Sequence, residues 1–199
     1  MRRGDIDRFF LEVSREIVVP VRVYLTGGIA SWFMGGDRPT EDIDFGLSVA
    51  KGHWDQVEKS FQGVSQRLNI PIQFSDDIGR WGMVGVSGYE KGSRLYKKFA
   101  KISVYLLDPA IWSVGKINRY YRSDVEDLRA VLKKQKTTPI KLIQAWAKAL
   151  RESPRSSAQL LFVKTGEDFL KNYGNEIWGE GFDSAKSIAY FRKLAGLLS

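Results

Sequence analysis

A pair of glycines followed by a pair of aspartates constrains this chain of 199 residues more than any other feature. The run Val21–Leu25 alternates and is rich in β-branched and aromatic residues, which predicts a strand that stops at Gly27. A short helical stretch follows Gly28, and the first-turn N–H groups of a helix can approach an anionic ligand closely where glycines precede them. This part of the sequence therefore predicts a phosphate-binding loop.

Asp42 and Asp44 stand one residue apart where the apolar run Ile43–Val49 begins. At strand spacing the two carboxylates project from one face, where they can hold a divalent cation such as Mg²⁺ or Mn²⁺. In aspartyl-phosphate phosphatases and many metal-dependent glycosyltransferases an Asp-x-Asp follows an apolar strand, because the ligand lies beyond the strand end. Here the acids open the strand instead. A surface turn with scattered acids is the alternative explanation of the pair.

The diglycine, the helical stretch and the Asp-x-Asp together resemble the DNA polymerase β-type nucleotidyltransferase superfamily. More narrowly, they resemble small bacterial nucleotidyltransferase-like proteins, which include abortive-infection and toxin-type members, through Gly27-Gly28-x-Ala30 and Arg38-x-Thr40-x-Asp42-Ile43-Asp44. The similarity continues into a second block, formed by Leu107-Asp-Pro109 and then Lys116, Arg119, Asp124 and Asp127. The resemblance covers about residues 21 to 132.

This resemblance implies transfer of a nucleoside monophosphate from a nucleoside triphosphate to an acceptor hydroxyl. It implies Asp42 and Asp44 as catalytic residues and as the ligands of Mg²⁺ or Mn²⁺. A nearby cation stabilises charge that develops on phosphoryl oxygens, which is the role we expect for Lys116. The nucleotide-binding residues implied are Gly27, Gly28, Ser31, Arg38 and Thr40.

One feature departs from the superfamily pattern. Active members carry a third acid in a later strand, facing the Asp-x-Asp pair, but the predicted strand Lys101–Leu107 contains no acid. Asp76, Asp77 and Asp108 are the nearest replacements. A second hypothesis therefore stays open, in which the chain is a catalytically inactive protein of this fold that binds nucleotide or RNA.

The second block also has a structural explanation. Ser123–Glu126 matches a capping box, which would make Asp124 a first-turn acid favoured by the helix dipole. On one continuous helix Lys116, Asp124 and Asp127 would share a face with Arg119. The four residues are then compatible with a buried ion cluster as well as with a catalytic site.

The order of predicted elements indicates an α+β fold. The apolar spacing predicts helices over 5–18 and 53–68 and strands over 21–25, 43–49, 70–74, 81–88 and 101–107. After these strands, apolar residues recur at helical spacing only. We expect a nucleotidyltransferase-like mixed β-sheet flanked by helices in residues 1–108 and a C-terminal helical bundle in residues 109–199. The bundle helices are predicted over 109–120, 124–136, 140–150, 155–173 and 184–198.

Trp81 lies beside glycines, where it could stack on a base or pack under a loop.

Charge is unevenly distributed along the chain. Residues 91–164 hold 17 Lys and Arg against 5 Asp and Glu, whereas the whole chain has a net charge of +8. A basic segment of this size favours a nucleic acid partner, here RNA, although solvated helix faces would give the same composition.

The single histidine excludes histidine triads. The absence of cysteine, of an apolar stretch of roughly 20 residues and of a signal peptide predicts a cytoplasmic protein without a membrane contact.

Overall fold

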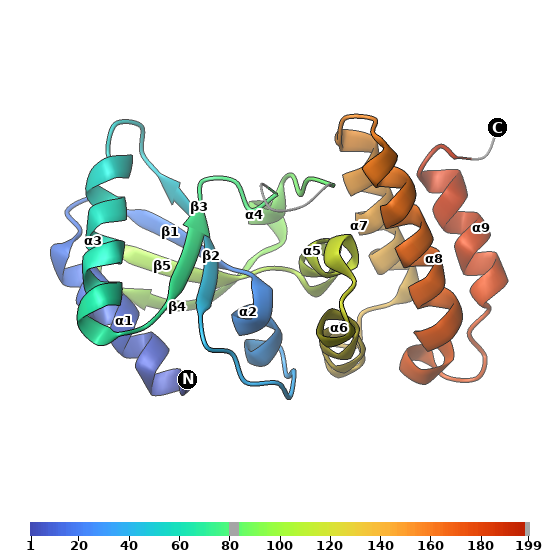
Figure 1. The fold of residues 1–199 in the computed structure, drawn as a ribbon, viewed down its shortest axis with the longest axis horizontal. Helices are drawn as coiled ribbons and strands as arrows, with labels where there is room; N and C mark the ends of the chain where they lie inside the picture. The colour runs from blue at the N-terminus through green and yellow to red at the C-terminus, as the bar shows by residue number, and fades with distance from the viewer. Residues whose placement is uncertain (80–83, 198–199) are drawn as a thin grey trace. The chain divides into compact units, whose positions relative to one another are not determined.

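The structure is a computed structural model that describes residues 1–79 and 84–197. The chain forms two compact units, shown as a ribbon in Figure 1. The first unit comprises Met1–Phe33, Arg38–Ile78 and Glu90–Leu107, and the second comprises Met34–Asp37, Gly79–Tyr89 and Asp108–Ser199. The main division follows residue 107, and two short segments from the first half of the chain join the helical unit.

A mixed β-sheet forms the centre of the first unit. Five strands lie in the order β3-β2-β1-β5-β4 within the described part of the chain. The central strand β1 is antiparallel to β2 and parallel to β5, while β3 is parallel to β2 and β4 is antiparallel to β5. The strands are β1 (Val21–Leu25), β2 (Ile43–Val49), β3 (Ile72–Ser75), β4 (Arg94–Phe99) and β5 (Ile102–Leu106).

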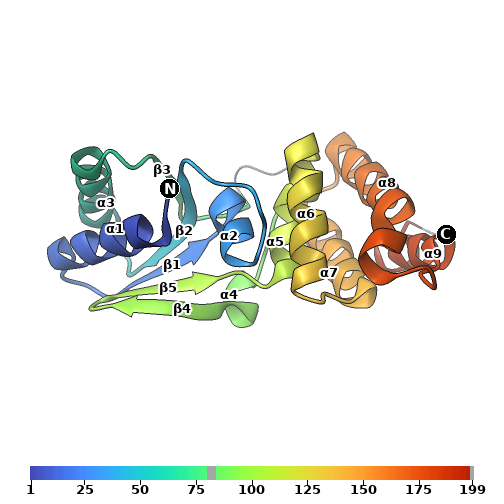
Figure 2. The same ribbon diagram turned by 90° about the horizontal axis from the view of Figure 1, so that it is seen from below.

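Two helices, α1 (Arg3–Glu16) and α3 (Trp54–Leu68), lie on the same side of this sheet (Figure 2). Phe45 of β2 has no exposed surface, and its ring lies 6.1 Å from that of Phe10 in α1 and 5.2 Å from that of Phe61 in α3. Alternation along β2 therefore sends Phe45 into an aromatic core and Asp44 to the opposite face. The short helix α2 (Gly27–Phe33) connects β1 to β2, and α4 (Tyr89–Gly92) precedes β4.

The second unit is helical. Trp146 of α7 has no exposed surface, and its Nε1 donates a hydrogen bond of 2.8 Å to Ser113 Oγ of α5. The rings of Phe162, Phe169 and Phe191 surround the indole from α8 and α9. The helices are α5 (Pro109–Arg119), α6 (Arg122–Lys134), α7 (Pro139–Glu152), α8 (Ser157–Trp178) and α9 (Ser184–Leu194).

The α+β class is confirmed, and one predicted strand is wrong. Within the predicted strand 81–88 the described residues 84–88 form no strand, while Trp81 lies outside the described residues. Val84 instead exchanges two backbone hydrogen bonds with the side chain of Asn118, and Gly85 N donates to Ser153 Oγ. The edge strand beside β5 is β4. Its Lys97 and Lys98 are exposed because an edge strand tolerates charge, so its sequence lacks a clear alternation.

None of the described helices combines the length and the apolar character needed to cross a membrane.

Candidate active site

The diglycine Gly27-Gly28 and the aspartate pair lie at the same end of β2. Thr26 N donates a hydrogen bond of 2.9 Å to the main-chain oxygen of Asp44, and Thr26 O accepts one of 3.0 Å from Ala30 N. Thr26 therefore bonds to Asp44, one residue past the last β1–β2 pair, and also to the first turn of α2. This arrangement brings the diglycine beside the second aspartate. β2 begins at Ile43, so the aspartates open the strand as predicted.

Gly27 and the carboxylate of Asp44 are in close approach. Gly27 has a φ of +57°, and a Cβ placed on it would lie only 1.8 Å from Asp44 Oδ2. Glycine is required here twice, because an L side chain is strained at this φ and because the space belongs to the carboxylate. Asp44 itself is half-buried.

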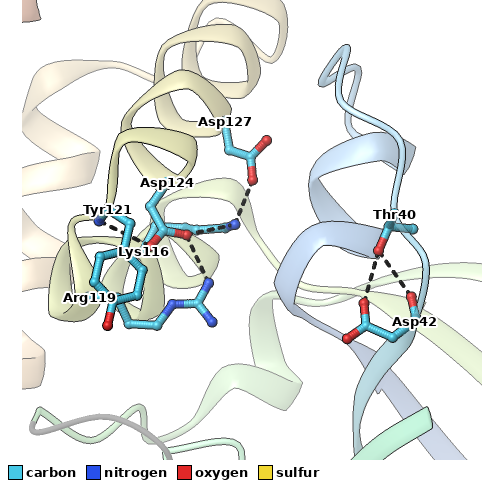
Figure 3. Close-up of polar contacts among 7 residues, drawn as sticks. All are labelled: Thr40, Asp42, Lys116, Arg119, Tyr121, Asp124 and Asp127. Atoms are coloured by element: carbon cyan, nitrogen blue, oxygen red, sulfur yellow. Dashed lines mark hydrogen bonds and ion pairs between the residues drawn. The ribbon is translucent and has the colours of Figure 1, made fainter. Parts of the chain in front are cut away.

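Arg38 and Thr40 lie around the second glycine. A Cβ on Gly28 would be 3.1 Å from Thr40 Oγ1 and 3.7 Å from Nη2 of Arg38. Thr40 is 6% exposed, and its hydroxyl lies 3.1 Å from both the main-chain oxygen and Oδ1 of Asp42 (Figure 3). Thr40 therefore orients Asp42, while Arg38 brings a guanidinium, a preferred phosphate-binding group, to Gly28.

Ser31 lies one turn further along α2. It is 1% exposed, and its hydroxyl has no hydrogen-bond partner within the described part of the chain. A buried hydroxyl without a partner costs about 1–3 kcal/mol. An oxygen of a ligand that reached Ser31 would remove that cost.

The face of the sheet that carries Asp44 carries no second row of acids. On β5, Ile102, Val104 and Leu106 are buried in the core, and Ser103 and Tyr105 occupy the opposite face, as the alternation predicted. Within residues 1–79 and 84–197, no cluster of three or more His, Cys, Asp and Glu side chains could hold a metal ion. The pair is therefore the acidic centre of the site.

Two of the candidate replacements for a third carboxylate belong to the first unit, and Asp108 belongs to the second. β3 runs parallel to β2 with Gln73 beside Asp44, so Asp76 lies three residues past that point, or roughly 10 Å of extended chain, and is exposed. Asp77 is the next residue and is exposed too. Asp108 caps α5, accepting a 3.0 Å hydrogen bond from Ala110 N, and pairs with Lys141.

The donor set at the pair fits a hard divalent cation. Mg²⁺ is held in proteins by one or two carboxylates and completes its octahedron with waters and substrate phosphates. Asp42 and Asp44 supply two half-buried carboxylates, and Arg38 Nη2 would lie 3.7 Å from a Cβ placed on Gly28. These residues would hold Mg²⁺ or Mn²⁺ only together with oxygens from water or a bound phosphate.

Lys116, in the second unit, is part of a buried ion cluster. Its Nζ lies 3.0 Å from Asp124 Oδ1 and 2.5 Å from Asp127 Oδ2, and the three side chains are 2–3% exposed (Figure 3). Arg119 adds a 2.8 Å contact to Asp124. The predicted ion cluster is confirmed, and a structural role accounts for each of these contacts. That Lys116 acts on a triphosphate stays a prediction.

One detail of the second block is corrected. The four residues lie on two helices, as the predicted ranges 109–120 and 124–136 imply, and Tyr120 with its left-handed φ of 53° separates α5 from α6. Ser123 is not the cap of α6: the N-cap is Tyr121, whose N–H donates 3.3 Å to Asp124 Oδ2. Asp124 is a first-turn acid as predicted, although of a helix that begins at Arg122.

Sequence reasoning missed an aromatic pair on the face of Asp44. The rings of Tyr24 and Tyr105 stack with centroids 5.3 Å apart. Tyr24 pairs with Gly46, two positions along β2 from Asp44. Burial raises the pKa of Tyr24 above its usual value, against the opposing effect of Arg22. The polar-face positions of β1 and β5 are visible in the sequence, but their pairing depends on the parallel register.

Comparisons of the chain with protein-family models, with curated proteins and with solved structures gave no match.

The close approach at Gly27 predicts a specific effect of one methyl group. Gly27→Ala should lower the affinity for Mn²⁺ by about tenfold or more, because the new Cβ takes the space of Asp44 Oδ2 and moves that ligand. Electron paramagnetic resonance of free Mn²⁺ during titration measures this. Gly52→Ala is the matched control, since Gly52 also has a positive φ (+87°) but no atom within 4 Å of an added Cβ. Equal metal affinity in the two variants would contradict the assigned geometry.

The ion cluster predicts a large loss of stability for Lys116→Met. Removing one partner from a buried ion pair costs about 3–5 kcal/mol, because carboxylates are left uncompensated in the interior. Lys148→Met makes the same substitution in an exposed pair with Glu152 and should cost about 1 kcal/mol or less. Urea denaturation followed by far-UV circular dichroism compares the two. A Lys116→Met protein of wild-type stability would argue against the structural role.

Proposed function

We propose that the first unit is a nucleotidyltransferase-fold domain that transfers a nucleoside monophosphate from a nucleoside triphosphate to an acceptor hydroxyl, with Mg²⁺ or Mn²⁺ as cofactor. The observation that carries the proposal is the convergence at the start of β2. The carboxylate of Asp44 lies against Gly27, while Thr40 joins Gly28 to Asp42. A glycine loop and a carboxylate pair at one point are the two parts that binding of a metal–triphosphate complex requires.

Each residue of the site has a role in this reaction. Gly27 leaves room for the Asp44 carboxylate, backbone N–H groups of the glycine loop meet the β- and γ-phosphates, and Arg38 adds a charged donor beside Gly28. Thr40 holds Asp42 in place by its hydroxyl. Ser31 can donate its unpartnered hydroxyl to a ligand oxygen. A metal ion bound by Asp42 and Asp44 would supply positive charge to the phosphate oxygens during transfer.

The reaction is an in-line substitution at the α-phosphorus. The acceptor oxygen forms a bond to this phosphorus as the bond to the α–β bridging oxygen breaks, and pyrophosphate leaves with that electron pair. The acceptor proton passes to water or to a carboxylate of the pair. No third carboxylate joins the pair in the described ranges, so these are the bases that the site offers.

The absence of a third carboxylate at the pair, within the described ranges, favours a second candidate function. A protein with the glycine loop and the aspartate pair but no third acid could bind nucleotide or RNA without chemistry. The two candidates share their binding residues and differ only in turnover. Incubation with each labelled nucleoside triphosphate, Mg²⁺ and total cellular RNA separates them, because only the enzyme forms a labelled product.

An RNA acceptor is supported by the basic segment 91–164. Five of its 17 cationic residues belong to the first unit, in 91–107, and twelve belong to the second. Several of these residues are held in ion pairs, among them Lys97, Lys116, Arg129 and Lys141. Lys133, Lys134 and Lys136 are exposed, and none of them forms an ion pair in the described structure, which leaves their charges available to phosphates.

Removal of one carboxylate tests the nucleotide site. Asp44→Asn should weaken Mg²⁺-dependent binding of a nonhydrolysable triphosphate by about tenfold or more, about 1.4 kcal/mol, because the amide is a poorer cation ligand. Calorimetric titration measures the loss. Glu41→Gln removes the same charge from an exposed neighbour of the pair and serves as the control. Unchanged affinity in Asp44→Asn, or an equal loss in Glu41→Gln, would remove the metal site from the proposal.

Salt dependence tests the RNA acceptor. Each phosphate contact with a single strand contributes about 0.7 to the slope of log affinity against log salt, so replacing Lys133, Lys134 and Lys136 by Glu should lower the slope by about 2. Fluorescence anisotropy with labelled RNA measures it, and triphosphate affinity should not change. Glu at the exposed Lys51, Lys59 and Lys171 makes the same net charge change outside the basic segment. A salt-independent affinity, or equal slopes in both triple variants, would point to a protein or small-molecule acceptor.

A further inference from the structure

A large apolar groove runs across the second unit. It has a volume of about 1020 Å³ and is open to solvent rather than enclosed. One wall is formed by the end of α6 and the first turns of α7, and the other by the end of α8, the turn after it and α9. Leu132 and Ile143 are buried in its floor, whereas Ile140 on the lip is 58% exposed. An exposed apolar surface of this kind marks an interaction site.

Lysines line both walls of this groove. Lys133 and Lys136 belong to the α6 side, and Lys186 and Lys193 belong to α9. All four are exposed, and none forms an ion pair within the part of the chain that the structure describes. The acid among the described lining residues is Asp183, which caps α9 by accepting a 2.9 Å hydrogen bond from Lys186 N. The rim therefore has a net positive charge.

The groove is held in shape by contacts within the unit. Trp178 Nε1 of α8 donates a 2.7 Å hydrogen bond to Thr137 O, which ties the two walls together. The Phe182 ring lies 4.8 Å from the ring of Trp178 and packs against Gly174, where an added Cβ would come within 2.1 Å of it. A site that is already formed costs little reorganisation when a partner binds.

We propose that this groove binds an acidic amphipathic helix of a partner protein. The apolar stripe of such a helix fills the floor, and acidic residues on its two flanks meet the lysines of the two walls. Lys186 and Lys193 are seven residues apart on α9, two helical turns or about 10.5 Å, which matches the spacing of acids one heptad apart on a helix lying alongside.

The distribution of charge distinguishes this occupant from two others. A fatty acid carries one anionic group, which would use one lysine and leave the lysines on the facing wall without a partner. RNA that contacts Lys133 and Lys136 on the α6 side would leave the apolar floor without a partner, because its phosphates gain nothing from an apolar surface. A helix with an apolar stripe between acidic flanks matches both the floor and the rim.

The test uses the 199-residue chain and synthetic peptides of about five helical turns, roughly 18 residues. The acidic peptide carries Leu at core positions of the heptad and Glu on both flanks, and a second peptide replaces each Glu by Lys. Fluorescence anisotropy should show binding of the acidic peptide alone. The double substitution Lys186→Glu and Lys193→Glu should weaken it by about tenfold or more, as should Ile140→Glu at the exposed lip.

A matched control lies on α8, where Lys164 and Lys171 are also exposed and seven residues apart but do not line the groove. Their double substitution by Glu should leave peptide affinity unchanged, and triphosphate binding should be unchanged in all variants. The proposal is overturned if neither peptide binds, if the two double variants weaken binding equally, or if palmitate or an RNA oligonucleotide binds the groove while the acidic peptide does not. These outcomes are independent of the nucleotide site.

Discussion

The carboxylate of Asp44 occupies the space that any side chain at position 27 would need, and the candidate site depends on this approach. It is created by the antiparallel pairing of β1 with β2, which continues past the strand end through the hydrogen bond from Thr26 N to Asp44 O. The same hydrogen bond fixes where α2 begins. The positions of Thr40 and Asp42 also depend on this hydrogen bond, because the chain between α2 and β2 passes close to Gly28. The glycine loop and the aspartate pair thus share one backbone anchor.

Each unit has a buried aromatic cluster behind its proposed binding surface. Phe45 locks β2 against α1 and α3, so the residues on the other face of that strand have a fixed position. Trp146 plays the same part for α5, α7, α8 and α9, with its polar Nε1 satisfied by Ser113. The buried pairing of Lys116 with Asp124 and Asp127 joins α5 to α6. These interactions make the proposed nucleotide site and the lysine-rimmed groove preformed surfaces.

The sequence predicted a helix or strand well where the spacing of its apolar residues was regular. The helices of the second unit and the strands β1, β2 and β5 have clear apolar patterns, and each lies within a few residues of its predicted place. β4 was missed because an edge strand with exposed Lys97 and Lys98 has no clear alternation. The strand expected around residue 84 failed because its backbone groups bond to Asn118 and Ser153, side chains distant in the sequence. The break between α5 and α6 was predicted close to its observed place, and the left-handed backbone of Tyr120 accounts for it.

The sequence by itself determined the α+β class, the diglycine and aspartate pair as candidate site residues, and the absence of an acid from β5, because these depend on local period and residue type. Only the tertiary structure decided that Gly27 touches Asp44, that Thr40 orients Asp42 and that Lys116 is buried between two carboxylates, because each contact joins segments through pairing or packing. The apolar groove also belongs to the tertiary structure. Its lysines look like ordinary solvated charge along the chain, and only the packing of α6, α7, α8 and α9 gathers them around one apolar floor.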